Sequence, residues 1–182
     1  MATVLLCVLS SPTGVQGQTL RLNLQQLEDA SDAVVLGRMV SSESAWTADR
    51  SAILTRVDIE VHDPETGAVI GMQTVTVPGG QVGEYVHEVS DMPYFREGEE
   101  VAVFLTQHPT GAMIVTGGWQ GKLEIVSNPS GGEKRILGAE HLMEEEVTGF
   151  LATGNGSEVE RQRKTFPLSE FVKRVKKLDR EQ

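Results

Sequence analysis

The sequence predicts a mainly β domain, an antiparallel barrel or alternatively a β-sandwich, with a C-terminal amphipathic helix packed on it. Three observations carry this prediction. Residues 95–105 place a charged turn before an apolar run whose two faces are both apolar, as in a central strand. Residues 52–62 alternate between apolar and other side chains, as in a strand with one face in water. About seven strand-like segments, separated by turn signals, precede residue 127.

The chain divides into four parts. Residues 1–17 look like the remnant of a signal peptide, and residues 18–126 form the β-barrel domain. A loop or linker follows over residues 127–165, where the sequence is rich in Gly, Ser and Glu. The amphipathic helix occupies residues 166–182. At 182 residues, one domain with appendages is the expectation, and such a chain can bury a proper core.

The N-terminus predicts export. Residues 2–9 are apolar but too short to span a bilayer, and small residues follow up to Gly17, as before a signal peptidase site. Basic residues that usually open a signal peptide are missing, so a start further upstream is one interpretation and a frayed apolar terminus is the alternative. We expect a secreted, periplasmic or cell-envelope protein. The single cysteine, Cys7, lies in this leader, so the body has neither a disulfide nor a thiolate metal site.

The first half of the domain predicts a short helix and a three-stranded meander. The helix ends near Asp29, because the preceding leucines are spaced partly as in a helix. The strands cover residues 33–40, 52–62 and 69–77. Gly37 within the first strand indicates a bulge or a sharp bend, and the remaining residues up to 50 are polar.

The second half continues the sheet. Residues 78–83 are expected to interrupt it, residues 85–89 to form an edge strand, and residues 112–116 to return as a hairpin from the central strand. A further strand covers residues 122–126. The C-terminal helix begins at about Pro167, which suits a first helical turn. Its apolar stripe contains Leu168, Phe171, Val172, Val175 and Leu178.

Four residues are the candidate binding surface: Tyr94, Phe95, Trp119 and Gln120. Large aromatic side chains in loops at the end of a sheet are typical anchors for a ligand or partner. The alternative is structural, since the same side chains could plug the mouth of the barrel or pack under the C-terminal helix.

No pattern predicts catalytic residues, a metal site or a cofactor. The histidines lack the spacing of metal ligands, and no Ser or Cys has the context of a nucleophile. The four histidines are His62, His87, His108 and His141. The glycines around Trp119 lack the spacing of a phosphate loop, and Leu123 stands where such a loop needs Ser or Thr. An enzyme is therefore not expected, with a small extracellular hydrolase or metal-dependent enzyme as the alternative.

The charge of the chain is negative and uneven. A net charge of -10 argues against nucleic acid as a partner. Residues 161–182, however, hold eight basic and three acidic side chains. The basic helix 166–182 could attach an envelope structural protein to an anionic membrane. Docking of its apolar stripe on the acidic barrel is the favoured interpretation.

Three stretches resemble an uncharacterised group of bacterial exported proteins: Ser31–Arg38, Thr74–Gly83, and Phe95–Leu105 together with Gln120-Gly121-Lys122. More distantly, residues 31–126 are similar to the netrin-like, or tissue-inhibitor-of-metalloproteinase, domain. The similarity lies in a Val-rich first strand with Gly, an alternating second strand, and a Gly-Glu turn before an apolar strand.

The resemblance implies an OB-like five-stranded barrel and a role in binding other exported proteins. Netrin-like domains are rich in disulfides, and the inhibitors insert an N-terminal cysteine into a protease. The body of this chain has no cysteine, so that mechanism is not implied. The sequence therefore predicts an exported, non-enzymatic β-domain that binds an unknown exported protein or other ligand.

Overall fold

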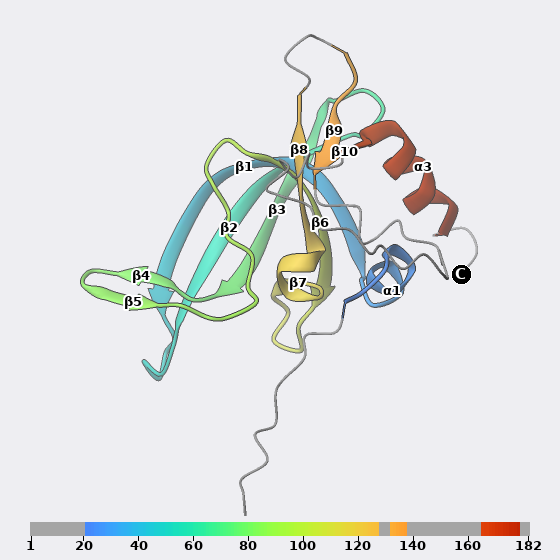
Figure 1. Ribbon diagram of the computed structural model, residues 1–182. Helices are drawn as coiled ribbons and strands as arrows, with labels where there is room; N and C mark the ends of the chain where they lie inside the picture. Colours follow the sequence, from blue (N-terminus) through green and yellow to red (C-terminus); the bar gives the residue numbers. More distant parts are fainter. Residues whose placement is uncertain (1–20, 128–131, 138–164, 179–182) are drawn as a thin grey trace, which may run out of the picture.

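The computed structural model describes residues 21–127, 132–137 and 165–178 (Figure 1). The expected leader 1–17 and most of the expected linker lie outside these residues. The helices and strands are α1 (Leu24–Asp29), β1 (Ala33–Trp46), β2 (Ile53–His62), β3 (Val69–Pro78), β4 (Gly80–Val82), β5 (Tyr85–His87), β6 (Glu100–Gln107), β7 (Met113–Val115), the 3-10 helix η1 (Gly118–Gly121), β8 (Lys122–Val126), β9 (Arg135–Leu137), β10 (Thr165–Pro167) and α3 (Leu168–Leu178). The protein is mainly β, as predicted.

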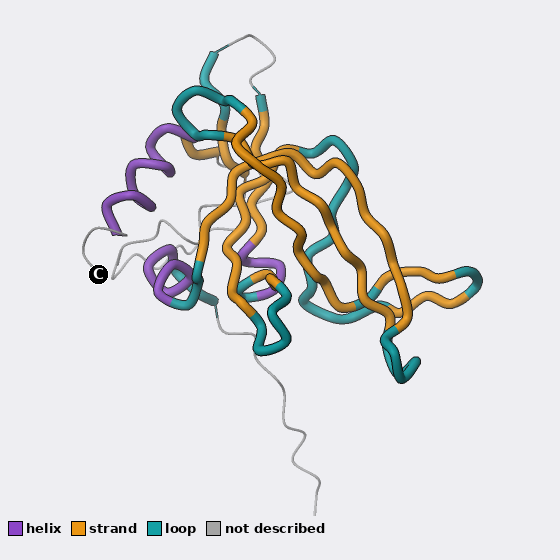
Figure 2. The backbone as a smooth tube through the Cα atoms, turned by 180° about the vertical axis from the view of Figure 1, so that it is seen from behind, coloured by secondary structure: helices purple, strands orange, loops and turns teal. Residues whose placement is uncertain are grey.

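One antiparallel sheet of eight strands dominates the described residues. Its order is β10-β9-β8-β6-β1-β2-β3, and β4 and β5 form a separate hairpin. The strands β7 and β8 pair with the same edge of β6, β7 beside its second half and β8 beside its first half. Figures 1 and 2 show β1, β2 and β3 as long, curved neighbours, with both helices on the far side of β6.

The sheet curls so that β3 comes to lie beside β7. Both strands run in the direction of β1, because each is separated from it by two antiparallel pairings. They are not neighbours in the hydrogen-bonded order of the sheet. The described sheet therefore has an open side between β3 and β7.

The strand β6 is central and apolar on both faces, which confirms the prediction. Ala102 and Phe104 face the helices, whereas Val101, Val103 and Leu105 face the inside of the curled sheet. All five side chains are fully buried.

The C-terminal helix docks on β6, as favoured from the sequence. The fully buried ring of Phe171 meets Phe104 edge to face, with 6.2 Å between the ring centroids. The helix α3 begins at Leu168, next to the expected start at about Pro167. Phe166 and Pro167, which the expected range 166–182 included, instead pair with β9 in the short strand β10.

The short helix α1 ends at Asp29, as expected. The Asn23 side chain accepts a hydrogen bond from the backbone N–H of Gln26, and the Gln26 side chain accepts one from the backbone N–H of Asn23. This reciprocal capping stabilises the start of a helix that is only six residues long. Leu24 and Leu27 then cover the same face of the sheet as α3.

The first strand is longer than predicted and its irregularity lies elsewhere. It continues through the polar residues to Trp46, because β2 pairs with it along this whole length. The register shifts between Met39 and Ser41, not at Gly37. At Gly37 a Cβ atom would collide with the carbonyl oxygen of Glu60, so the glycine permits a close approach of β1 and β2.

Residues 78–83 interrupt the main sheet, as expected, although they include β4, which pairs with β5 in a separate hairpin. Residues 127–165 were expected to form an ordered loop or small hairpin and then a linker. They include β9, which extends the main sheet beyond residue 126. Three-residue strands are too short to produce a clear alternation, although Ile136 in β9 is fully buried.

Candidate functional site

The structure brings together the two segments that carry the predicted binding residues. The backbone N–H of Trp119 donates to the carbonyl oxygen of Asp91 at 2.9 Å, and the Lys122 ammonium donates to the carbonyl oxygen of Tyr94 at 2.6 Å. Gly118 has a φ of 61°, and a Cβ atom there would collide with the Asp91 carbonyl oxygen. Glycine at this position allows the two loops to touch.

The four predicted residues divide into an exposed pair and a buried pair. Tyr94 and Trp119 are 78% and 43% exposed and remain candidates for contact with a partner. Phe95 and Gln120 are 8% and 2% exposed. Both buried residues therefore have structural contacts, and of the two only Phe95 enters the interior of the curled sheet.

Phe95 and Gln120 fill different sites. The Phe95 ring packs into the inside of the curled sheet, in the same apolar cluster as Met39 and Val101. The Gln120 side chain accepts a hydrogen bond from the backbone N–H of Leu22 at 2.9 Å. One residue closes the interior, and the other fastens the segment that leads into α1.

Lys122 holds the segment before β6 through several contacts. Its ammonium lies 2.6 Å from a carboxylate oxygen of Glu99 and 4.9 Å from the centroid of the Phe95 ring. The two charged side chains are only 11% and 8% exposed. Sequence reasoning missed this pair, because the alternation of residues 122–126 places Lys122 on the side of the strand that was expected to face water.

An apolar cleft of about 340 Å³ lies at the open side of the sheet, between β3 and the hairpin that joins β6 to β7. Its lining includes Leu54, Pro78, Met92, Pro93, Ala112 and Ile114. Sequence reasoning missed it, because Leu54 lies on the face of residues 52–62 that was expected to meet water. The signal was the apolar nature of Leu54 on that face.

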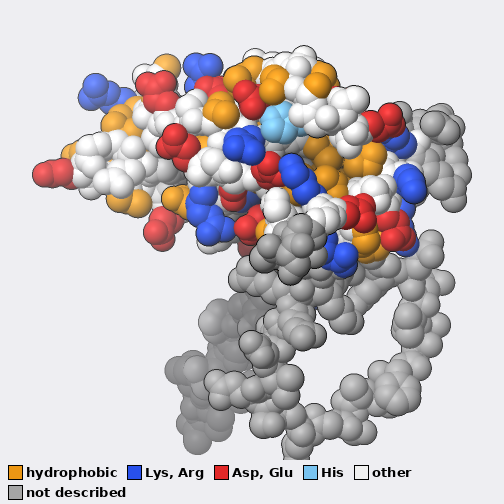
Figure 3. Space-filling model, turned by 90° about the horizontal axis from the view of Figure 1, so that it is seen from above, with side chains coloured by type: hydrophobic (Ala, Val, Ile, Leu, Met, Phe, Trp, Pro, Cys, Tyr) orange, Lys and Arg blue, Asp and Glu red, His pale blue; other side chains and the backbone are white. Residues whose placement is uncertain are grey.

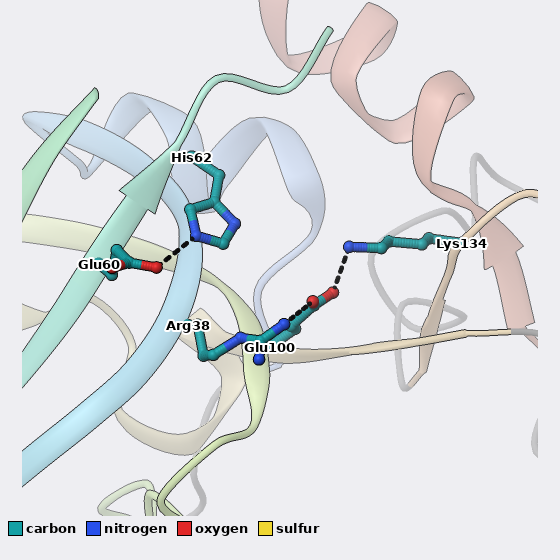
Figure 4. Close-up of polar contacts among 5 residues, drawn as sticks. All are labelled: Arg38, Glu60, His62, Glu100 and Lys134. Atoms are coloured by element: carbon teal, nitrogen blue, oxygen red, sulfur yellow. Dashed lines mark hydrogen bonds and ion pairs between the residues drawn. The ribbon is translucent and has the colours of Figure 1, made fainter. Parts of the chain in front are cut away.

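A group of charged side chains joins β1, β6 and the segment before β9 (Figure 4). Glu100 accepts hydrogen bonds from Arg38 at 2.9 Å and from Lys134 at 2.6 Å, while the His62 ring contacts Glu60 at 3.0 Å. Burial acts to raise the pKa of Glu100, but these two cations outweigh it and hold the pKa below its usual value. Figure 3 shows basic and acidic side chains interleaved on this face.

His87 and His108 take part in hydrogen bonds, His87 with a neighbouring segment and His108 within its own turn. His87 accepts from the backbone N–H of Ile53 at 3.4 Å, and His108 contacts the Thr110 hydroxyl at 2.8 Å. His141 lies outside the described residues. Within the part of the chain that the structure describes, no three His, Cys, Asp or Glu side chains are grouped so that they could hold a metal ion. No helix among the described residues is long and apolar enough to cross a membrane.

Comparisons with protein-family models, with curated proteins and with solved structures find no match to this chain.

Proposed function

We propose that this protein is an exported, non-enzymatic binding module that holds an apolar ligand group at the open side of an OB-like barrel. The observation that carries the proposal is the apolar cleft beside Met92 and Pro93. Ligand sites are typically concave, mostly apolar and roughly 300–1,000 Å³ in volume, and the cleft falls within this range.

The exposed side chains beside the cleft support the proposal. Met92 lines one wall and is itself 36% exposed. Trp119 and Tyr94 lie on the loops that continue from this wall, and large aromatic side chains are common anchors for partners. His108 and Thr110 on the opposite wall add the few polar groups that orient a ligand.

The strand arrangement supports an OB-like barrel. The meander β1–β2–β3, the pairing of β1 with β6 and of β6 with β7, and the parallel approach of β3 to β7 give the strand order expected of such a barrel. The docked helix favours a binding module over membrane attachment through residues 166–182. Its Phe171 is already buried against Phe104, and Lys176 pairs with Glu65 at 2.6 Å.

The test uses N-phenyl-1-naphthylamine, an apolar fluorescent probe, with the full chain and two variants. Ala112→Phe adds a ring inside the cleft, whereas Ala68→Phe adds one at an exposed position of the turn between β2 and β3. We expect the unmodified protein to bind the probe, Ala112→Phe to weaken binding at least about tenfold, or about 1.4 kcal/mol, and Ala68→Phe to leave it unchanged. Absence of binding, or equal binding by both variants, would contradict the proposal.

A further inference from the structure

The two outer strands of the main sheet differ in how they are protected from pairing with another chain. At one end, β10 has three residues, ends in Pro167 and runs directly into α3. At the other end, β3 has ten residues. Short edge strands, edge prolines, edge charges and β-bulges are the usual means by which proteins prevent strand addition. The edge β10 is only three residues long and ends in a proline. In β3 the pairing with β2 shifts register once, between Val69 and Gly71, is regular from Gly71 to Pro78, and has a proline only at its last residue.

The edge strand β3 contains no charged residue between Val69 and Pro78. Its first half is also apolar and exposed: Val69, Ile70 and Met72 are 59%, 65% and 58% exposed. Thr76, Val77 and Pro78, in the second half of the strand, line the cleft together with residues of β7, which leaves the first half as the accessible part of the edge. Exposed apolar side chains on an uncharged edge strand favour association.

The backbone at this edge is directed outward. The N–H of Gly79 donates to the carbonyl oxygen of Ile53, so residues of β3 in phase with Gly79 bond to β2. Along an antiparallel strand, the N–H and C=O groups of successive residues point alternately toward one neighbouring strand and away from it. Met72 is an odd number of residues from Gly79, so its N–H and C=O are directed away from β2. Thr74 has the same phase, but its carbonyl oxygen already accepts a hydrogen bond from the Gln73 side chain at 2.8 Å. The free pairing positions thus centre on Met72.

We propose that β3 pairs with β3 of a second copy of this chain, in an antiparallel arrangement whose two-fold axis passes close to Met72. Two identical edges related by such an axis present matching donors and acceptors, so one exposed strand makes a complete interface. The lack of charge in β3 matters because the chain is acidic, with a net charge of -10. The other long strands, β1, β2 and β6, each contain charged residues, so β3 is the long strand that meets its own copy without bringing like charges together.

The interface is a small one. A few residue pairs of strand bury less than the roughly 1,200 Å² of a stable standard interface. The apolar side chains Val69, Ile70 and Met72 add to the backbone pairing. A weak, reversible dimer is the expected result.

Sedimentation velocity of the full chain over a wide concentration range tests the proposal. We expect a concentration-dependent monomer–dimer equilibrium. In Met72→Lys, the two-fold axis places two ammonium groups opposite each other, and we expect the dissociation constant to rise at least about tenfold. Val86→Lys, at a residue of β5 that is 62% exposed, is the matched control and should leave it unchanged. Both side chains are exposed, so both variants should fold, which far-ultraviolet circular dichroism checks.

Cross-linking provides the second measurement. In a Cys7→Ser background, Met72→Cys should form a covalent dimer under mild oxidation, and Val86→Cys should not. A protein that stays monomeric at every concentration would overturn the proposal, as would a dimer unaffected by Met72→Lys. Failure here leaves the cleft and its apolar probe untouched, because Met72 does not line the cleft.

Discussion

The two faces of β6 are covered in different ways. On one face, Phe104 is buried by α1 and α3, which come from opposite ends of the described chain. On the other face, Val101, Val103 and Leu105 are buried because the sheet curls over itself and Phe95 enters from the loop before β6. The first face is closed by added helices, and the second by the sheet and one side chain.

This difference explains on which face of β6 the cleft lies. The helices bury the central side chains of their face, since Phe104 and Phe171 are both fully buried. On the other face, β3 and β7 lie beside each other without pairing, and the apolar cleft lies between them. The exposed Tyr94 and Trp119 belong to the loops on the same side.

The largest loss of stability is expected when a charge is introduced into the helix-covered face of β6. Phe104→Asp would bury a carboxylate without a partner and should lower the free energy of unfolding by more than about 4 kcal/mol. Urea denaturation followed by circular dichroism measures this. A variant that melts near the temperature of the unmodified protein would show that β6 is not central.

A comparison of Phe171→Ala with Phe95→Ala separates the two faces directly. Each change should cost about 3–4 kcal/mol if its face unfolds together with the sheet, because a large buried ring is removed. Hydrogen exchange reports where protection is lost. We expect the loss to centre on α3 in Phe171→Ala and on residues 91–99 in Phe95→Ala. The same exchange pattern in both variants would mean that the two faces act as one core.

The buried ion pair at the loop end gives the next effect. Lys122→Met leaves Glu99 in a site with little solvent and without its closest cation, which should cost about 3 kcal/mol. The double variant Lys122→Met with Glu99→Gln should recover part of that loss, because no buried charge is then left alone. Chemical denaturation of the single and double variants measures the recovery. Equal stability of both would exclude an uncompensated charge as the cause.

The smallest effect concerns the ionic contacts between β1, β6 and the segment before β9. The pKa of Glu100 is held below its usual value of 4.5 by Lys134 and Arg38, so its contribution is complete above that pH and is lost as pH falls through the lowered pKa. Glu100→Gln should therefore cost about 1 kcal/mol at neutral pH and progressively less below pH 4.5. Urea titrations at a series of pH values measure this, with Glu97→Gln at an exposed turn position as the control. A cost that does not change with pH would contradict the assignment.

The predicted strands followed closely from side-chain alternation where a strand is long. The inward set of β2, which includes Val57 and Ile59, is buried as expected. Among the three-residue strands, β5 and β7 lie within expected strands, whereas β4 and β10 were not expected, because their pairing depends on partners and not on their own pattern. Prediction also failed for the polar half of β1, where the hydrogen-bonded neighbour β2 overrides a weak local preference.

The candidate site was predicted only in part. Aromatic residues in loops identified the loop end but could not separate exposed Tyr94 from buried Phe95, its neighbour in the chain. That choice depends on which side of the loop faces the curled sheet. The Lys122–Glu99 pair and the cleft join segments far apart in sequence, so no local pattern could show them.

The sequence by itself determined the class of this protein: a mainly β chain whose central strand is apolar on both faces and whose C-terminal helix has one apolar stripe. These features depend on the spacing of side chains along the chain, which is local. Only the tertiary structure decided which strands lie beside each other across the curl, where the cleft lies, and which edge strand stays open. Those features depend on how far the sheet curls and on which strands meet, and that balance is set by contacts between distant residues.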